Sequence, residues 1–88
     1  MTMNEFITTI NKAAEIYNGE IISMRNDFEG NLHVLLTPKN FDALDMEVTA
    51  AYPCIHPACQ GDWELEKQVG NIIFTVYHQG EYRQEAAS

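Results

Sequence analysis

Basic residues are scarce in this sequence. Lysine and arginine together number 5, against 13 aspartates and glutamates, which gives a formal net charge of -8. Binding to a nucleic-acid backbone depends on lysine and arginine side chains that displace condensed counterions. We therefore expect no direct contact with nucleic acid. A protein partner of this chain is expected to present a basic surface.

Long apolar runs are also missing. The longest clusters, such as Val34–Leu36 and Ile72–Phe74, fall well short of the roughly 18 residues that a membrane span requires. The first residues include neither the basic nor the apolar segment of a secretory signal. The sequence therefore predicts a cytoplasmic protein that does not bind membranes.

Cysteine occurs only twice, at Cys54 and Cys59. Together with His56 they place three zinc-ligating side chains in one proline-containing loop, but a closed zinc site needs a fourth ligand, and there is no second cysteine pair. We therefore expect two unlinked thiols, with no metal and no other cofactor. A small zinc-stapled structural module is the alternative. A disulfide between the two cysteines is disfavoured by the expected reducing compartment.

The spacing of apolar residues changes along the chain from a helical pattern to strict alternation. Apolar residues recur at helical spacing through the first 17 residues, after a capping box made by Thr2 and Glu5, and Gly19 is expected to end this helix in a left-handed conformation. Apolar and polar residues then alternate in five runs, near residues 21–28, 32–37, 44–52, 62–68 and 72–78. Residues 37–40, Thr-Pro-Lys-Asn, are expected to form a turn.

This pattern predicts an α+β fold with one N-terminal helix packed on an antiparallel sheet of about five strands. The expected two-layer single domain covers residues 1–79, and residues 80–88 form a polar C-terminal tail. The alternation places Tyr52, Trp63 and Phe74 on the core side of the sheet.

Carboxylates recur on one side of the third and fourth predicted strands. The five side chains are Asp45 and Glu47 from the third strand and Asp62, Glu64 and Glu66 from the fourth. Because consecutive strands are usually neighbours, they are expected to form one exposed patch, while Lys67 points to the opposite face. Like charges on neighbouring strands cost stability. The patch therefore either keeps the protein soluble or binds a basic partner.

These features predict a non-enzymatic acidic protein-binding module whose partner has a basic surface, such as that of a nucleic-acid-binding protein. By analogy with other small acidic domains, it would act as an inhibitor or nucleic-acid mimic of phage or mobile-element anti-defence type. The acidic surroundings of Cys54 and His56 argue against a thiolate nucleophile. A self-associating accessory subunit is a further alternative, with a homodimer formed through a sheet edge or through Ile73 and Tyr77.

Overall fold

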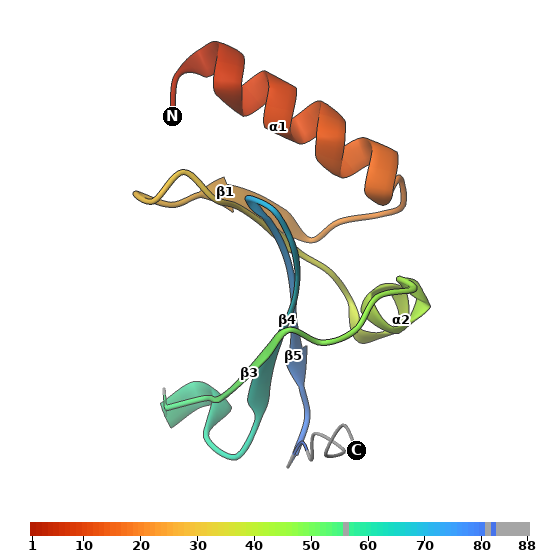
Figure 1. Cartoon of the computed structure of the whole chain (residues 1–88). Coiled ribbons are helices and arrows are strands. Elements are labelled where there is room, and N and C mark those ends of the chain that lie inside the picture. The colour runs from red at the N-terminus through yellow and green to blue at the C-terminus, as the bar shows by residue number, and fades with distance from the viewer. Residues whose placement is uncertain (56, 81, 83–88) are drawn as a thin grey trace.

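The computed structural model describes residues 1–55, 57–80 and 82. In chain order, its elements are α1 (Met3–Ile16), β1 (Ser23–Asn26), β2 (Leu32–Leu35), α2 (Pro38–Ala43), β3 (Ala50–Pro53), the short 3-10 helix η1 (Pro57–Cys59), β4 (Trp63–Val69) and β5 (Ile72–His78). The strands form one twisted sheet in the order β1-β2-β5-β4-β3 (Figure 1). No helix among the described residues is long and apolar enough to cross a membrane.

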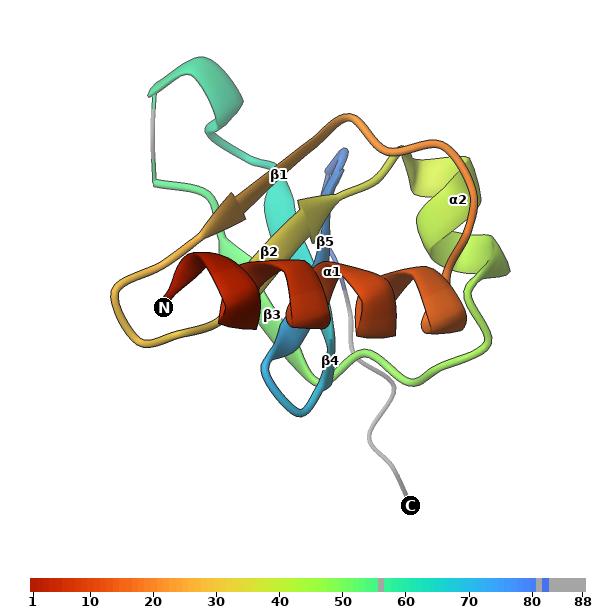
Figure 2. The same ribbon diagram turned by 90° about the horizontal axis from the view of Figure 1, so that it is seen from above.

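Both α-helices pack against the same face of this sheet. The ring of Tyr17, just after α1, contacts Phe74 of β5 edge-to-face, with 6.1 Å between the ring centroids. Lys67 of β4 is paired with Phe74 across the strands and contacts Phe41 of α2. Seen from above, α1 lies across the sheet, with α2 near the end of α1 that is farther from the N-terminus (Figure 2).

The start of α1 follows the prediction, but its end does not. The Thr2 hydroxyl accepts a hydrogen bond from the Glu5 backbone N–H at 3.2 Å. The helix ends where Tyr17 takes an extended conformation, and Gly19 is not in the left-handed region. A Cβ at position 19 would collide with the ring of Tyr17, so a larger residue there would have to displace that side chain.

The α+β class and the five strands are confirmed, but the sheet is mixed rather than wholly antiparallel. Three strand pairs are antiparallel, whereas β2 and β5 are parallel. Their register sets Leu32 beside Ile72 and Val34 beside Phe74, and all four side chains are buried. The parallel pairing therefore aligns the apolar residues of both strands with the core.

Helix α2 replaces the turn predicted at residues 37–40. Thr37 is its N-cap, and its hydroxyl accepts from the Asn40 backbone N–H at 3.4 Å. Pro38 begins the helix, where its fixed φ suits the helix and its missing N–H would have had no partner in any case. The Thr-Pro pair is typical of a helix start as well as of a turn, and the turn interpretation was wrong.

The third predicted strand is shorter than expected because its alternation changes phase. Only Ala50–Pro53 pairs with β4, and Thr49 joins the sheet through a 2.8 Å bond from its N–H to the carbonyl oxygen of Glu66. Val48 and Ala51 both pack against the core, although they are three residues apart. Tyr52 therefore faces away from the core and is 51% exposed, so its predicted core position is wrong.

The core lies between the helices and the sheet. Its buried members are Ala13, Leu32, Val34, Leu36, Phe41, Leu44, Leu65, Ile72, Phe74 and Val76. Trp63 packs against this cluster, as predicted, and so does Tyr82 from the predicted tail. The Tyr82 ring also meets His78 edge-to-face, with 5.6 Å between the ring centroids. Residues 81 and 83–88 of that tail lie outside the described residues, and the domain boundary at 79 stays a prediction.

Candidate functional site

The face of the sheet opposite the helices is the candidate site, and we call it the open face. The strand register defines its side chains as Ser23, Arg25, His33, Leu35, Ala50, Tyr52, Glu64, Glu66, Gln68, Ile73, Thr75 and Tyr77. In Figure 1 both helices lie on the other side of the strands. Ile73 and Thr75 in the middle of this face are buried, so Ile73 is not available for the dimer contact that the sequence suggested. The side chains around them are the part of the face that the fold leaves available for contact.

A row of three side chains crosses β3, β4 and β5 on the open face. Glu64 is paired with Tyr52 on one side and with Tyr77 on the other. Each tyrosine is 51% exposed, and Glu64 between them is half-buried. A carboxylate therefore lies between two accessible aromatic side chains.

Glu66 lies in the next row of the open face, between Ala50 and Thr75. Burial raises the pKa of its carboxyl group, the negative charge of Glu64 raises it further, and His33 acts in the opposite direction. Among the described residues, neither Glu64 nor Glu66 has a salt-bridge partner or a side-chain hydrogen bond. The two carboxylates are thus close together and unneutralised.

A hollow of about 110 Å³ continues the open face towards β1. Its lining residues are Ser23, Arg25, His33, Leu35, Glu64, Thr75 and Tyr77. Arg25 supplies a cation at one end, and Glu64 supplies an anion at the other. The hollow is smaller than the roughly 300–1,000 Å³ of ordinary small-molecule pockets, so it suits a side chain better than a metabolite.

The turn between β1 and β2 is organised by Asp27. One carboxylate oxygen accepts from the backbone N–H groups of Glu29 and Asn31, both at 2.9 Å, and the other lies 2.7 Å from Nε2 of His33. The Asn31 N–H and then His33 are the largest causes that lower the pKa of Asp27. The sequence analysis missed this cluster. The available signal was an aspartate followed by Gly30 and Asn31 between two alternating runs, which is typical of an Asx turn.

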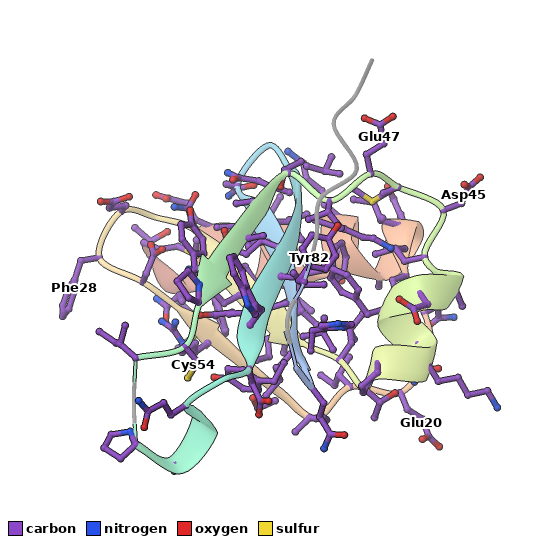
Figure 3. The ribbon with its side chains drawn as sticks, turned by 90° about the horizontal axis from the view of Figure 1, so that it is seen from below. Glu20, Phe28, Asp45, Glu47, Cys54 and Tyr82 are labelled. Carbon is purple, nitrogen blue, oxygen red and sulfur yellow. The ribbon has the colours of Figure 1, made fainter. Side chains whose placement is uncertain are left out.

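The five predicted carboxylates do not form one patch. Asp45 and Glu47 are exposed in the link after α2 and point away from the strands in Figure 3. Asp62 lies just before β4, where its side chain accepts from the Gly80 N–H at 3.0 Å. The physical reason is that the link containing Asp45 and Glu47 does not extend β3. Only Glu64 and Glu66 remain together on the open face.

Lys67 points to the opposite face, as predicted, and is 5% exposed. Its Nζ donates to the carbonyl oxygens of Phe41 at 2.6 Å and Leu44 at 2.8 Å, and lies 4.3 Å from the centre of the Phe41 ring. Burial lowers the pKa of Lys67, while Asp42 and Asp45 raise it. This charge is satisfied inside the fold and belongs to the core rather than to the site.

The cysteine loop differs from its prediction. Cys54 is disulfide-bonded, so the expectation of two unlinked thiols is wrong and its sulfur is not a free zinc ligand. The Cys54 N–H donates to the carbonyl oxygen of Asp62 at 2.8 Å, which closes the base of the loop and brings its ends together. His56 and the side chain of Cys59 lie outside the described part. Among the described residues, no group of three His, Cys, Asp or Glu could hold a metal ion.

Comparison of the chain with protein families, with curated proteins and with solved structures gives no match. The case for a function therefore depends on the geometry of the chain itself.

Proposed function

We propose that the protein is a non-enzymatic binding module whose open face receives a cationic side chain of a partner protein. The observation that carries the proposal is the cross-strand row Tyr52–Glu64–Tyr77. The predicted five-carboxylate surface is thereby reduced to Glu64 and Glu66. Mimicry of a nucleic acid needs a longer array of negative charge than this pair supplies, and it is not part of the proposal.

The chemistry of the row favours a guanidinium or an ammonium group. A charged donor forms short, strong hydrogen bonds with a carboxylate, and a cation is attracted to the face of an aromatic ring. Glu64 supplies the carboxylate, while Tyr52 and Tyr77 supply the rings. Tyrosine is also enriched among the residues that dominate binding energy at protein interfaces.

Glu66 adds a driving force to this recognition. Its pKa is raised because burial and the nearby Glu64 make its charged form costly. A cation bound beside Glu64 would lower that cost, so part of the binding energy would come from relief of repulsion within the free protein. Arg25, at the far end of the hollow, would repel a cation at that end and so favour binding at the end that contains Glu64.

The test is a titration of the full chain with a fluorescent hexa-arginine peptide, followed by anisotropy. A peptide with citrulline in place of arginine keeps the shape and removes the charge. We expect the arginine peptide to bind, and the double variant Glu64→Gln, Glu66→Gln to weaken it at least about tenfold. Affinity should also fall with added salt, because screening weakens attraction between exposed charges.

The matched control is the double variant Asp45→Asn, Glu47→Gln. It removes the same amount of charge from exposed positions beside α2 and should change the affinity by less than about twofold, because rim charges away from a site contribute little. Equal weakening by both double variants would mean that the peptide responds only to net charge, and the proposal would fail. Binding of the citrulline peptide with equal affinity would also contradict it.

A further inference from the structure

Phe28 is a fully exposed aromatic residue on the turn between β1 and β2, and Figure 3 shows it pointing away from the body of the protein. The turn is fixed by the hydrogen bonds of Asp27 and by Gly30, whose φ is 85°. A side chain on a fixed turn loses little conformational freedom on binding. These properties are typical of an anchor residue that enters a pocket on a partner.

An apolar groove lies between the C-terminal half of α1 and the strands β1 and β2. Its volume is about 170 Å³. The lining residues are Ile10, Ala13, Ala14, Tyr17, Asn18, Gly19, Ile21, Met24, Val34 and Phe74, none of them charged. An apolar cavity of about 150 Å³ is large enough to bind benzene, so this groove has room for a phenyl ring.

Strand β1 between these two features is a free sheet edge. Among the described residues it pairs only with β2, and all four of its residues are exposed. The Asp27 N–H bonds to the Asn31 carbonyl oxygen, and hydrogen-bonded pairs alternate along an antiparallel ladder, so Met24 and Asn26 direct their N–H and C=O groups to the free side. The free part of the edge begins after Ile22, because the Ile22 N–H bonds to the Leu35 carbonyl oxygen of β2 at 2.8 Å. The opposite edge, β3, ends in Pro53, which lacks an N–H.

A two-fold axis at Met24 would pair the free edges of two copies and bring Phe28 of each copy towards the groove of the other. Antiparallel pairing of two β1 strands about Met24 brings the turn that carries Phe28 to the link before β1 of the second copy, where Gly19 and Ile21 line the groove. In Figure 3, Phe28 and Glu20 lie at opposite ends of β1, as this pairing requires. An axis at Arg25 would instead set two arginines opposite one another, which is unfavourable.

We infer that two copies of this chain associate through β1, with Phe28 of each copy seated in the groove of the other. Such an interface is isologous and closes on itself. Each phenylalanine ring buries roughly 150–250 Å², so the two rings contribute roughly 300–500 Å², well below the roughly 1,200 Å² at which specific complexes begin. The dimer is therefore weak and depends on concentration.

The effect of added salt distinguishes the dimer from the proposed function. Each copy has a formal net charge of -8, so two copies repel, while the groove itself contains no charge. Added salt screens this repulsion and tightens the dimer, whereas it weakens the binding of a cation at the open face. Either proposal can thus fail while the other holds.

The experiment is sedimentation equilibrium of the full chain from about 1 μM to 1 mM, a range that brackets a weak dimer. We expect a shift from monomer to dimer, strengthened by salt. Phe28→Ala removes both anchor contacts and should raise the dissociation constant roughly 100-fold. The matched control, Ile55→Ala, alters an equally isolated apolar side chain that is 93% exposed on another loop, and it should leave the constant unchanged.

A mixing experiment tests the reciprocal geometry. Ala14→Glu places a charge in the groove at an exposed position of α1 and should abolish the dimer, with circular dichroism confirming the fold. The Phe28→Ala chain keeps an intact groove, and the Ala14→Glu chain keeps Phe28, so their mixture retains one anchor contact and should form a heterodimer. The inference is overturned by a wild-type monomer at every concentration, by a dimer insensitive to Phe28→Ala, or by an equal loss in Ile55→Ala.

Discussion

Two adjacent residues of β4, Glu66 and Lys67, have opposite surroundings. Lys67 lies on the helix-covered face, where its ammonium group donates to two backbone carbonyl oxygens and lies over the Phe41 ring. Glu66 lies on the open face, where burial and Glu64 raise its pKa and no described side chain neutralises it. The helix end supplies backbone acceptors that the open face lacks. A charge on the covered face is therefore structural, and a charge on the open face is left for a partner.

The largest expected effect comes from removing the charge of Lys67. Lys67→Met keeps the chain length over Phe41 but removes two charge-assisted hydrogen bonds, and we expect a loss of about 2–3 kcal/mol in the free energy of unfolding. Urea unfolding followed by circular dichroism measures this loss. Lys39→Met, at an exposed position of α2, is the control and should cost less than about 0.5 kcal/mol. Equal losses in the two variants would show that the Lys67 contacts contribute nothing beyond a surface charge.

A smaller effect is expected from the cap of α2. Thr37→Ala removes the hydroxyl that accepts from the Asn40 N–H and should cost about 1 kcal/mol. The end of α2 presents the carbonyl oxygens that bind Lys67. The loss of stability in Thr37→Ala should therefore be less than additive with the loss in Lys67→Met in a double-mutant cycle. Strict additivity would mean that the end of α2 does not depend on its start.

The smallest effect on stability is expected from a substitution on the open face, and this substitution should stabilise the protein. Because the pKa of Glu66 is raised above its ordinary value of 4.5, the folded protein holds this proton more tightly than the unfolded chain, and stability falls as the pH rises through the raised pKa. Glu66→Gln removes this loss. At pH 7 it should stabilise the protein by roughly 0.5 kcal/mol, the size of a like-charge contact on a sheet.

The control for Glu66→Gln is the pH dependence of the stability difference between this variant and the parent protein. Well below pH 4.5 the carboxyl group of the parent protein is protonated in both the folded and the unfolded state, so the stability difference between variant and parent should shrink. Unfolding curves at neutral and acidic pH measure it. Glu47→Gln, at an exposed position, should show no such change. A destabilised Glu66→Gln variant at pH 7 would contradict the description of the open face as a site of unrelieved repulsion.

Features that depend on the local spacing of apolar and polar residues were predictable from the sequence. The cap that Thr2 makes on α1, the extent of β5 and the direction of Lys67 each depend on residues within a few positions, and the structure confirms them. The pair Glu64 and Glu66 was found in the same way, because alternate residues of one strand share a face.

Features that depend on distant contacts were not predictable from the period. The phase change near Thr49 follows from bonds to Glu66 across the sheet, and it moves Tyr52 beside Glu64. Asp45 and Glu47 lie outside the predicted patch because the alternating pattern extends through residues 44–49, whereas β3 itself begins only at Ala50. The row that carries the proposed function therefore combines one predicted residue with two neighbours that the sheet supplies.

The α+β class, the surplus of negative charge and the faces of β4 could be derived from the sequence alone, because composition and short-range alternation are local properties. The parallel pairing of β2 with β5, the partners of Lys67 and the position of Glu64 between Tyr52 and Tyr77 became clear only from the folded chain. These depend on which strands become neighbours, and that choice is made by burial of the whole apolar set rather than by any single segment.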